Sequence, residues 1–252
     1  MIDFDAMARA GLLLVRPGSL IMTAPAFGDM FAPVQLRIAL TVLLAFMLAP
    51  VVAVPEVTGA LALGVVIARE MAIGFAFALA MRALFAGAEL AGQLSGMQLQ
   101  LSYGSVVNPQ GGVRNNVIGN LYANLALFTF FLINGPHVFI RNLASSYQSL
   151  PIGVGGIDAS IVTSVTDLLG VVFALGVRLA APLIVVMLVV ELATGLVART
   201  APAINLMVLS TPLRLVVGLL TIAALLPVLP PIITRFSALV AALGARTAEA
   251  FR

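Results

Sequence analysis

Apolar residues gather in long blocks in this chain, and the longest block runs from Leu61 to Asn116, where it ends in polar, glycine-rich sequence. No proline occurs between Val57 and Asn108, so about 40 residues can continue as a single helix. Such a helix is about 60 Å long, which is about twice the hydrocarbon thickness of a bilayer. We therefore expect that this helix bends back on itself or that much of it lies outside the lipid.

The end of this block is too polar for a lipid-facing helix. It contains glutamines, serines, paired glycines and an Asn-Pro step. Polar groups of this kind are stable at membrane depth only against protein or beside water. We therefore expect a buried junction or a loop along a water-filled path, formed by Ser102, Tyr103, Gly104, Ser105, Val106, Val107, Asn108, Pro109, Gln110, Gly111 and Gly112.

The remaining blocks predict further helices. Apolar spans are expected over Ile38–Val54, Val117–Ile140, Leu168–Val190 and Leu206–Ile233. A short helix that begins at Asp3 is expected to stop at Pro17-Gly18, because proline interrupts a helix. We expect a loop over Glu191–Asn205 and an amphipathic tail helix over Phe236–Arg252.

The composition supports a membrane protein. Of its 252 residues, 62% are hydrophobic and 9% are charged, whereas charged residues make up about 25% of a soluble domain. The chain has no cysteine and one histidine, His137, so thiolate and multi-histidine metal sites are excluded and no cofactor is expected. The 13 basic residues are scattered, which argues against a nucleic-acid-binding patch. The predicted fold class is all-α, with polytopic, membrane-associated helical hairpins and long broken helices.

Small residues in the second half of the long block predict close helix packing. Gly92 and Gly96 have the four-residue spacing that lets two helix backbones approach each other, and Gly87 lies in the same run. The alternative is that this face is turned toward lipid.

Some charged residues lie inside apolar segments, where lipid would surround an isolated helix, and three of them are candidates for burial. Arg82 and Glu89 are seven residues apart and therefore share a helix face, and Arg178 stands alone near the middle of its span. A charge at the bilayer centre is costly, so these side chains are expected to be buried against protein or to face water. Pairing between helices or subunits is one interpretation, and a proton or ion relay is the other.

Four stretches that follow one another along nearly the whole chain carry a family resemblance. They are Thr23-Ala24-Pro25-Ala26-Phe27 with Pro33 and Arg37, Glu89 to Gln98 with Leu101-Ser102-Tyr103, Leu132 to His137 with Leu150 to Gly153, and Leu192 to Asn205 with Pro212-Leu213. Their order and spacing resemble the FliR family of flagellar export-apparatus proteins and its injectisome counterpart. Two positions depart from that pattern: Asn108 stands where the family usually has an acidic residue, and Val106 where it commonly has an aromatic one. Tyr103 is the candidate to replace that aromatic.

The resemblance implies one subunit over residues 1–252, without enzymatic activity, that closes a helical ring made by FliP-like and FliQ-like partners, with an FlhB-like subunit nearby. Exported proteins in transit and membrane lipid are the other expected contacts, and nucleic acid is not. The implied location is the bacterial inner membrane, as a multi-pass protein of the flagellar basal body. In such a ring, the polar loop from Ser102 to Gly112 is expected to be the gate; the alternative is an ordinary exposed connection.

The predicted function is thus a core part of the flagellar type III protein export gate, which forms a channel for unfolded substrate proteins. A proton- or ion-coupled secondary transporter is the alternative, since broken helices and intramembrane charges are typical of transporters. A membrane scaffold without a pathway of its own is the third possibility.

Overall fold

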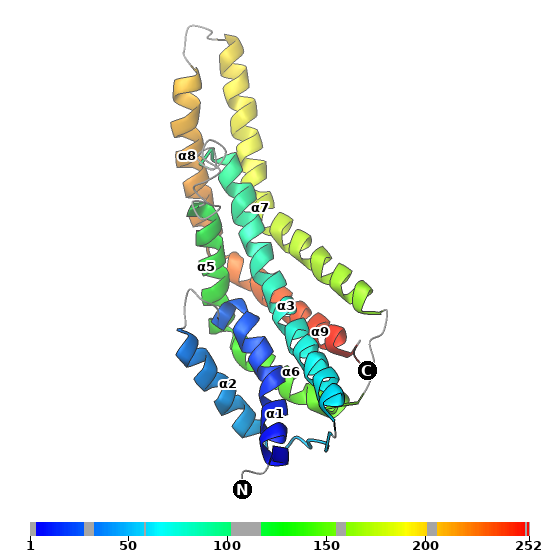
Figure 1. Cartoon of the computed structure of the whole chain (residues 1–252). Helices are drawn as coiled ribbons and strands as arrows, with labels where there is room; N and C mark the ends of the chain where they lie inside the picture. Colours follow the sequence, from blue (N-terminus) through cyan, green and yellow to red (C-terminus); the bar gives the residue numbers. More distant parts are fainter. Residues whose placement is uncertain are drawn as a thin grey trace. The chain divides into compact units, whose positions relative to one another are not determined.

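The computed structural model describes residues 4–27, 33–57, 59–101, 117–154, 160–200, 206–249 and 251, and every regular element within them is helical. The helices are α1 (Phe4–Thr23), η1 (Pro25–Phe27), α2 (Val34–Leu48), α3 (Ala60–Gln98), α5 (Val117–Leu132), α6 (Gly135–Ser149), α7 (Ser160–Thr200), α8 (Leu206–Leu225) and α9 (Leu229–Glu249) (Figure 1). The predicted all-α fold class is confirmed. The 39-residue α3 also confirms the long proline-free helix.

The chain divides into two compact units, and the long helices contribute to both. Unit 1 comprises Met1–Ala83, Phe131–Gly170 and Ser237–Arg252, and unit 2 comprises Leu84–Phe130 and Val171–Phe236. The boundaries between the units fall inside α3, α5, α7 and α9 rather than at loops.

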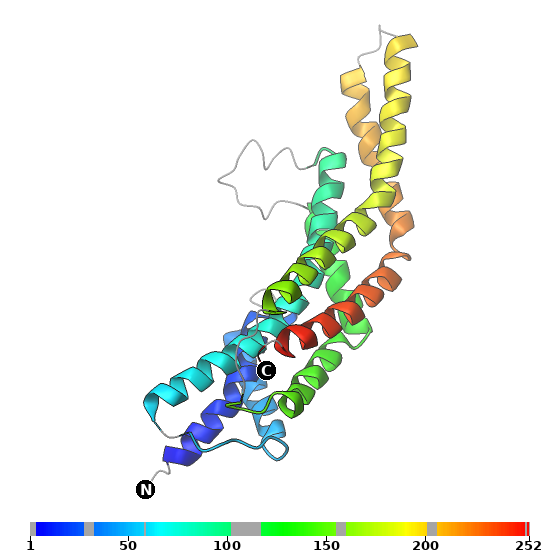
Figure 2. The same ribbon diagram turned by 90° about the vertical axis from the view of Figure 1, so that its right-hand side faces the viewer.

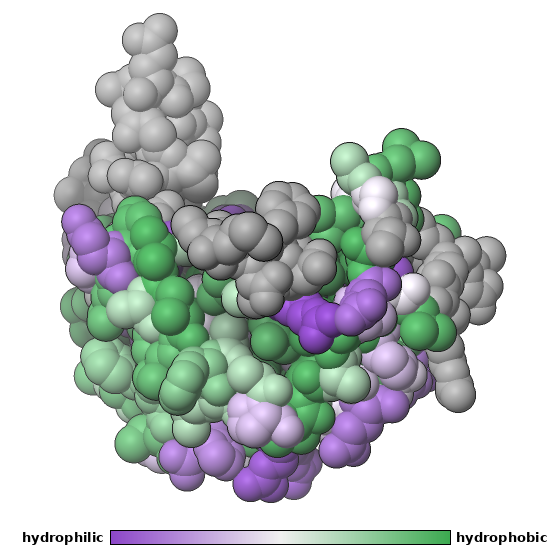
Figure 3. Space-filling model, turned by 60° about the horizontal axis from the view of Figure 1, so that its bottom comes forward, coloured by the Kyte–Doolittle hydropathy of each residue, from purple (hydrophilic) through white to green (hydrophobic). Residues whose placement is uncertain are grey.

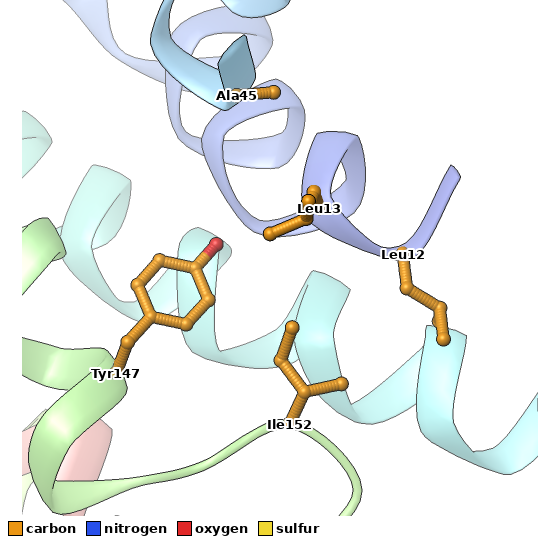
Figure 4. Close-up of a cluster of buried hydrophobic side chains, with 5 residues drawn as sticks. All are labelled: Leu12, Leu13, Ala45, Tyr147 and Ile152. Atoms are coloured by element: carbon orange, nitrogen blue, oxygen red, sulfur yellow. The ribbon is translucent and has the colours of Figure 1, made fainter. Parts of the chain in front are cut away.

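In unit 1, α1, α2 and α6 enclose a small hydrophobic cluster. Leu12 and Leu13 of α1 and Ala45 of α2 meet Tyr147 of α6 and Ile152 of the following turn (Figure 4). All five side chains are buried. The cluster joins segments that are far apart in sequence, because the turn after α6 folds back to α1.

Proline does not stop α1, contrary to the prediction. The helix continues through Pro17 to Thr23 and ends only before Pro25. A proline inside a helix removes one backbone hydrogen bond and typically costs about 3 kcal/mol. Here packing on both sides offsets that cost, since Leu12, Leu13 and Leu20 are buried before and after Pro17.

The helix α2 is shorter than the predicted span of residues 38–54. It has 15 residues, about 22 Å, and ends at Leu48, before Pro50. Its buried residues, Arg37, Thr41 and Ala45, repeat every four positions and form one narrow stripe. The rest of its apolar surface is exposed, with Phe46 as much as 78% exposed.

In unit 2, the second half of α7 and the whole of α8 run antiparallel as a hairpin (Figures 1 and 2). The stretch Glu191–Thr200, predicted as part of a loop, is helical, and Pro182 lies inside α7. Apolar surroundings favour this continuation, because a helix satisfies its own backbone polar groups when water does not. Elsewhere in unit 2, the rings of Phe85 on α3 and Phe130 on α5 pack edge to face, with their centres 5.6 Å apart.

The two other predicted spans are each broken. The apolar block from Val117 divides into α5 and α6 at a two-residue turn, where Asn134 takes a left-handed backbone conformation. The block from Leu206 likewise divides into α8 and α9. Polar or proline-containing sequence lies at both breaks. It is Asn134-Gly135-Pro136 at the first break and Pro227 at the second.

Among the described helices, α3 and α7 are each long and apolar enough to cross a membrane, and the pairs α5–α6 and α8–α9 add up to two more spans if each pair counts as one. Large apolar side chains are exposed on most helices, for example Leu61 (87%) and Leu132 (81%). Hydrophobic residues accordingly cover much of the described surface in the view of Figure 3. A surface of this kind requires lipid or partner protein around it.

Candidate functional site

A fully buried arginine, Arg16 of α1, is the centre of a polar cluster in unit 1. Its Nε donates to Oε2 of Glu70 on α3 over 2.7 Å, and its Nη1 donates to Oγ of Ser146 on α6 over 2.9 Å. Its Nη2 donates to the carbonyl oxygen of Leu150 over 3.0 Å. The guanidinium carbon lies 4.0 Å from the ring centre of Tyr147. One side chain thus connects α1, α3, α6 and the turn after α6.

The closeness of α1 and α3 at this cluster depends on Gly74. A Cβ at Gly74 would lie 2.3 Å from the carbonyl oxygen of Arg16 and 2.0 Å from Oγ of Ser19. No side chain fits between the two helices there. The glycine therefore lets the backbones approach until Glu70, one turn earlier on α3, reaches Arg16.

Sequence reasoning missed this cluster. It noted no partner for Glu70, because Arg16 is 54 residues away and stands at the predicted end of a short helix. The available signal was a charge inside each of two apolar segments, one of each sign. Only the packing of α1 on α3 shows that the two charges meet.

Two of the predicted close-packing glycines lie at tight helix contacts in unit 2. A Cβ at Gly92 would lie 2.4 Å from Cα of Gly119 on α5, so the two backbones touch. A Cβ at Gly87 would lie 2.9 Å from the side chain of Leu175 and 3.1 Å from the carbonyl oxygen of Val172, both on α7. The third glycine of the set, Gly96, is buried.

Two further glycines of unit 2 accommodate leucines in α3 or directly after it, and the sequence analysis did not single them out. A Cβ at Gly176 of α7 would lie 2.7 Å from the side chain of Leu90, and a Cβ at Gly218 of α8 would lie 1.8 Å from that of Leu99. Their role depends on which helix lies opposite, which the sequence does not reveal.

The end of α3 is fixed by a Schellman motif with glutamine in place of the usual glycine. Gln100 has a φ of 60°, and the N–H of Leu101 donates to the carbonyl oxygen of Gly96 over 3.1 Å. The N–H of Gln100 donates to the carbonyl oxygen of Met97, also over 3.1 Å. These two bonds satisfy carbonyl groups that a helix end leaves open. The hydroxyl of Thr211 on α8 donates to Oε1 of Gln100 over 3.1 Å and holds this end against α8.

The polar loop that follows, Ser102 to Gly112, lies outside the described residues. Its two described flanks are both anchored on helix contacts. Leu99 packs against Gly218 before the loop, and Gly119 packs against Gly92 after it.

The three charges predicted to be buried, Arg82, Glu89 and Arg178, are exposed in the chain by itself. Among the residues that the structure describes, the charged side chains that are fully buried are instead Arg16 and Glu70. Burial of the exposed three by partner subunits stays a prediction. The one described contact of Arg178 with a charged or aromatic group is with Phe236, whose ring centre lies 5.4 Å from its guanidinium carbon.

A second ion pair connects α7 with α8 in unit 2. Nη1 of Arg214 donates to Oε1 of Glu191 over 2.9 Å. Both charges belong to apolar helices, so their pairing lowers the cost of placing the hairpin in hydrocarbon. Among the described residues, no group of three or more carboxylate or histidine side chains is placed to hold a metal ion.

Comparisons of this chain with a family model and with known proteins point to the same family. The model of "Bacterial export proteins, family 1" matches residues 7–239. The chain is 32% identical over 218 residues to a flagellar biosynthetic protein FliR of Pectobacterium carotovorum subsp. carotovorum, covering 86% of this chain and 84% of that protein. It is 31% identical over 220 residues to that of Escherichia coli K12, with the same coverage of 86% and 84%. It is 32% identical over 223 residues to that of Caulobacter vibrioides, covering 85% of this chain and 86% of that protein. The chain therefore belongs to the bacterial export proteins of family 1, the family that includes these FliR proteins.

Proposed function

We propose that the chain is a non-enzymatic core subunit of the flagellar type III export gate and helps to form a channel for unfolded proteins across the bacterial inner membrane. The observation that carries this proposal is the family match over residues 7–239, which includes residues of both units. The matched relatives are named as flagellar biosynthetic proteins, which favours a flagellar system over an injectisome. The match also favours export over the alternative of an ion-coupled transporter.

The exposed charges of α3 support a role inside an assembly. Arg82 and Glu89 are exposed on a helix that is long and apolar enough to cross a membrane. A charge at the centre of a membrane helix costs about 2.5–3.5 kcal/mol on insertion scales, so neither residue is stable against hydrocarbon. Their seven-residue separation places them on one face, about 10 Å apart. A partner helix with charges of opposite sign at the same separation satisfies both.

The partners that we propose are FliP-like and FliQ-like subunits, which form a ring with this chain, and an FlhB-like subunit beside it. Exposed apolar side chains on most described helices are consistent with such extensive contacts. The glycine contacts within unit 2 show that the chain itself already packs helices at backbone distance.

The polar loop from Ser102 to Gly112 is proposed as the gate of the channel. The support comes from its sequence, which combines Asn108-Pro109 with Gly111-Gly112, and from its flanks. The Schellman motif at Gln100 and the contact of Gly92 with Gly119 hold both flanks on helices. Fixed flanks allow the segment between them to yield to a passing polypeptide without disturbing the helices that carry it.

Co-purification tests the proposal. The tagged full-length chain, expressed with its neighbouring genes and extracted in mild detergent, is expected to elute as a hetero-oligomer with FliP-like and FliQ-like subunits. A stable monomer or dimer that binds a small solute would contradict the proposal and support the transporter. A stable complex without any effect of gene deletion on export would support the scaffold.

A further inference from the structure

An apolar groove runs between α7 and α8 within unit 2. Its volume is about 420 Å³, and it is lined by Pro182 and Val186 of α7 and by residues of α8 between Val217 and Leu225. The polar side chain in the lining is that of Thr221, whose hydroxyl donates to the carbonyl oxygen of Val217 over 2.8 Å. The groove therefore offers hydrocarbon surface to any ligand.

An exposed positive charge stands at one end of this groove. Arg178 precedes Pro182 by four residues and so lies on the same face of α7. Its guanidinium carbon is 5.4 Å from the ring centre of Phe236, and no described carboxylate forms an ion pair with it. Pro182 has no N–H, so the carbonyl group of Arg178 also lacks its helical hydrogen bond.

The register of the hairpin shows where Arg178 lies along α8. Glu191 pairs with Arg214. Because the two helices are antiparallel, residues equally far before Glu191 and after Arg214 lie at the same level. Arg178 is 13 residues before Glu191, and Pro227, in the turn that follows α8, is 13 residues after Arg214. Arg178 therefore lies level with the end of α8.

The length of the hairpin fits the hydrocarbon layer of a bilayer. Positions 179 to 198, between Arg178 and Arg199, number 20 residues, and α8 also has 20 residues. Twenty helical residues rise about 30 Å, which is the thickness of the hydrocarbon layer. In this placement the charges inside the layer, Glu191 and Arg214, neutralise each other. Placing the earlier part of α7 in the layer would instead immerse Asp167 and Arg178, both exposed.

We propose that Arg178 and the groove together bind one anionic membrane phospholipid. The phosphate lies on the guanidinium, which binds phosphate oxygens in a bidentate manner, and one acyl chain runs along the groove past Pro182. The groove follows α8 from Leu225 to Val217, a rise of about 12 Å that an acyl chain easily spans. A phospholipid accounts for both the apolar groove and the charge at its end. A carboxylate from a partner subunit, which the sequence analysis allowed for Arg178, accounts only for the charge.

Native mass spectrometry of the purified full-length chain in its complex tests this site. Added phosphatidylglycerol is expected to remain bound with at least about a tenfold preference over phosphatidylcholine, and Arg178→Gln is expected to abolish that preference. Arg178→Lys, which keeps the charge but not the planar fork, is expected to retain part of it. Leu220→Phe, which fills the groove, is expected to lower the binding of both lipids.

Two matched variants are the controls. Arg199→Gln removes an arginine at the other end of the same 20-residue stretch, and Leu219→Phe enlarges an exposed α8 side chain that does not line the groove. Both are expected to leave lipid retention unchanged. Equal retention in Arg178→Gln and Arg199→Gln would overturn the proposal. So would loss of a partner subunit from Arg178→Gln with lipid retention unchanged, since that result assigns Arg178 to a protein contact.

Discussion

Arg16 and Glu70 form an ion pair of 2.7 Å with neither side chain exposed, although 54 residues separate them. The pair holds α1 on α3 inside unit 1, and the remaining donors of Arg16 reach Ser146 and the carbonyl oxygen of Leu150. A guanidinium with this many partners fixes one arrangement of three helices, because few other arrangements offer it the same acceptors. Burying two charges carries a desolvation cost that offsets their attraction. The ion pair therefore determines how the helices are arranged more than it adds to the net stability.

Removing one partner of this pair is expected to destabilise the chain strongly. Arg16→Met or Glu70→Gln leaves an uncompensated polar or charged group in the interior, and such changes typically cost about 3–5 kcal/mol. The measurement is the thermal stability of the purified hetero-oligomer. The double variant Arg16→Met, Glu70→Met is expected to recover part of the loss, because no buried charge remains.

The exposed ion pair between Arg9 and Glu56 is the control for this prediction. Arg9→Met is expected to change stability by less than about 1 kcal/mol, because solvent screens an exposed pair. If Arg16→Met behaves like Arg9→Met, the buried pair does not hold the three helices together.

A side chain at Gly92 is expected to separate α3 from α5. A Cβ there would lie 2.4 Å from Cα of Gly119, and backbone atoms cannot move aside as a flexible side chain does. Overpacking typically costs about 1–3 kcal/mol, and Gly92→Leu should reach at least the upper end of that range. The yield of the complex in detergent measures the effect. Gly195→Leu, at a position where a Cβ meets nothing within 4 Å, should leave the yield unchanged.

Gly96→Leu is expected to block complex formation as well. Gly96 is buried, and it shares the small-residue spacing of Gly92. Normal yield of the hetero-oligomer from a Gly96→Leu strain would show that this position tolerates a large side chain and does not mark a close contact.

Neutralising a charge of α3 is expected to weaken assembly rather than folding. Arg82→Leu and Glu89→Gln remove exposed groups, so the chain itself loses no described ion pair of either residue. If partner subunits carry the opposite charges, either change leaves one of them unpaired and should reduce co-purification of FliP-like and FliQ-like subunits. A complex that assembles normally and loses only proton coupling would point to the transporter instead.

Deleting Gly104 to Gly111 is expected to open the channel at rest. The flanks at Leu99 and Gly119 are anchored on Gly218 and Gly92, so assembly should survive the deletion largely intact. Resting cells should then leak ions or small molecules, measurable as loss of membrane potential in cells that express the complex. Normal export together with ion tightness equal to that of the parent would show that this loop is not the gate.

The sequence predicted the helices well where a single strong physical rule decided the outcome. The long apolar block without proline forms α3, as predicted. Proline caused the error at α1, because that helix continues through Pro17. The free-energy cost of a proline inside a helix can be predicted from the local sequence. The packing that offsets this cost involves other segments, which the local sequence does not identify.

The sequence by itself determined that this is a helical membrane protein of the bacterial export family, because composition and the order of its motifs suffice for both. It also pointed to Gly87 and Gly92, as small residues within one run of the long apolar block, and both lie at close helix contacts. Only the tertiary structure decided that Arg16 meets Glu70 and that Gly218 accommodates Leu99. It also decided that Pro182, one turn after Arg178, lines an apolar groove. Each of these relationships joins residues from different helices, and their pairing depends on which helices pack together rather than on any local pattern.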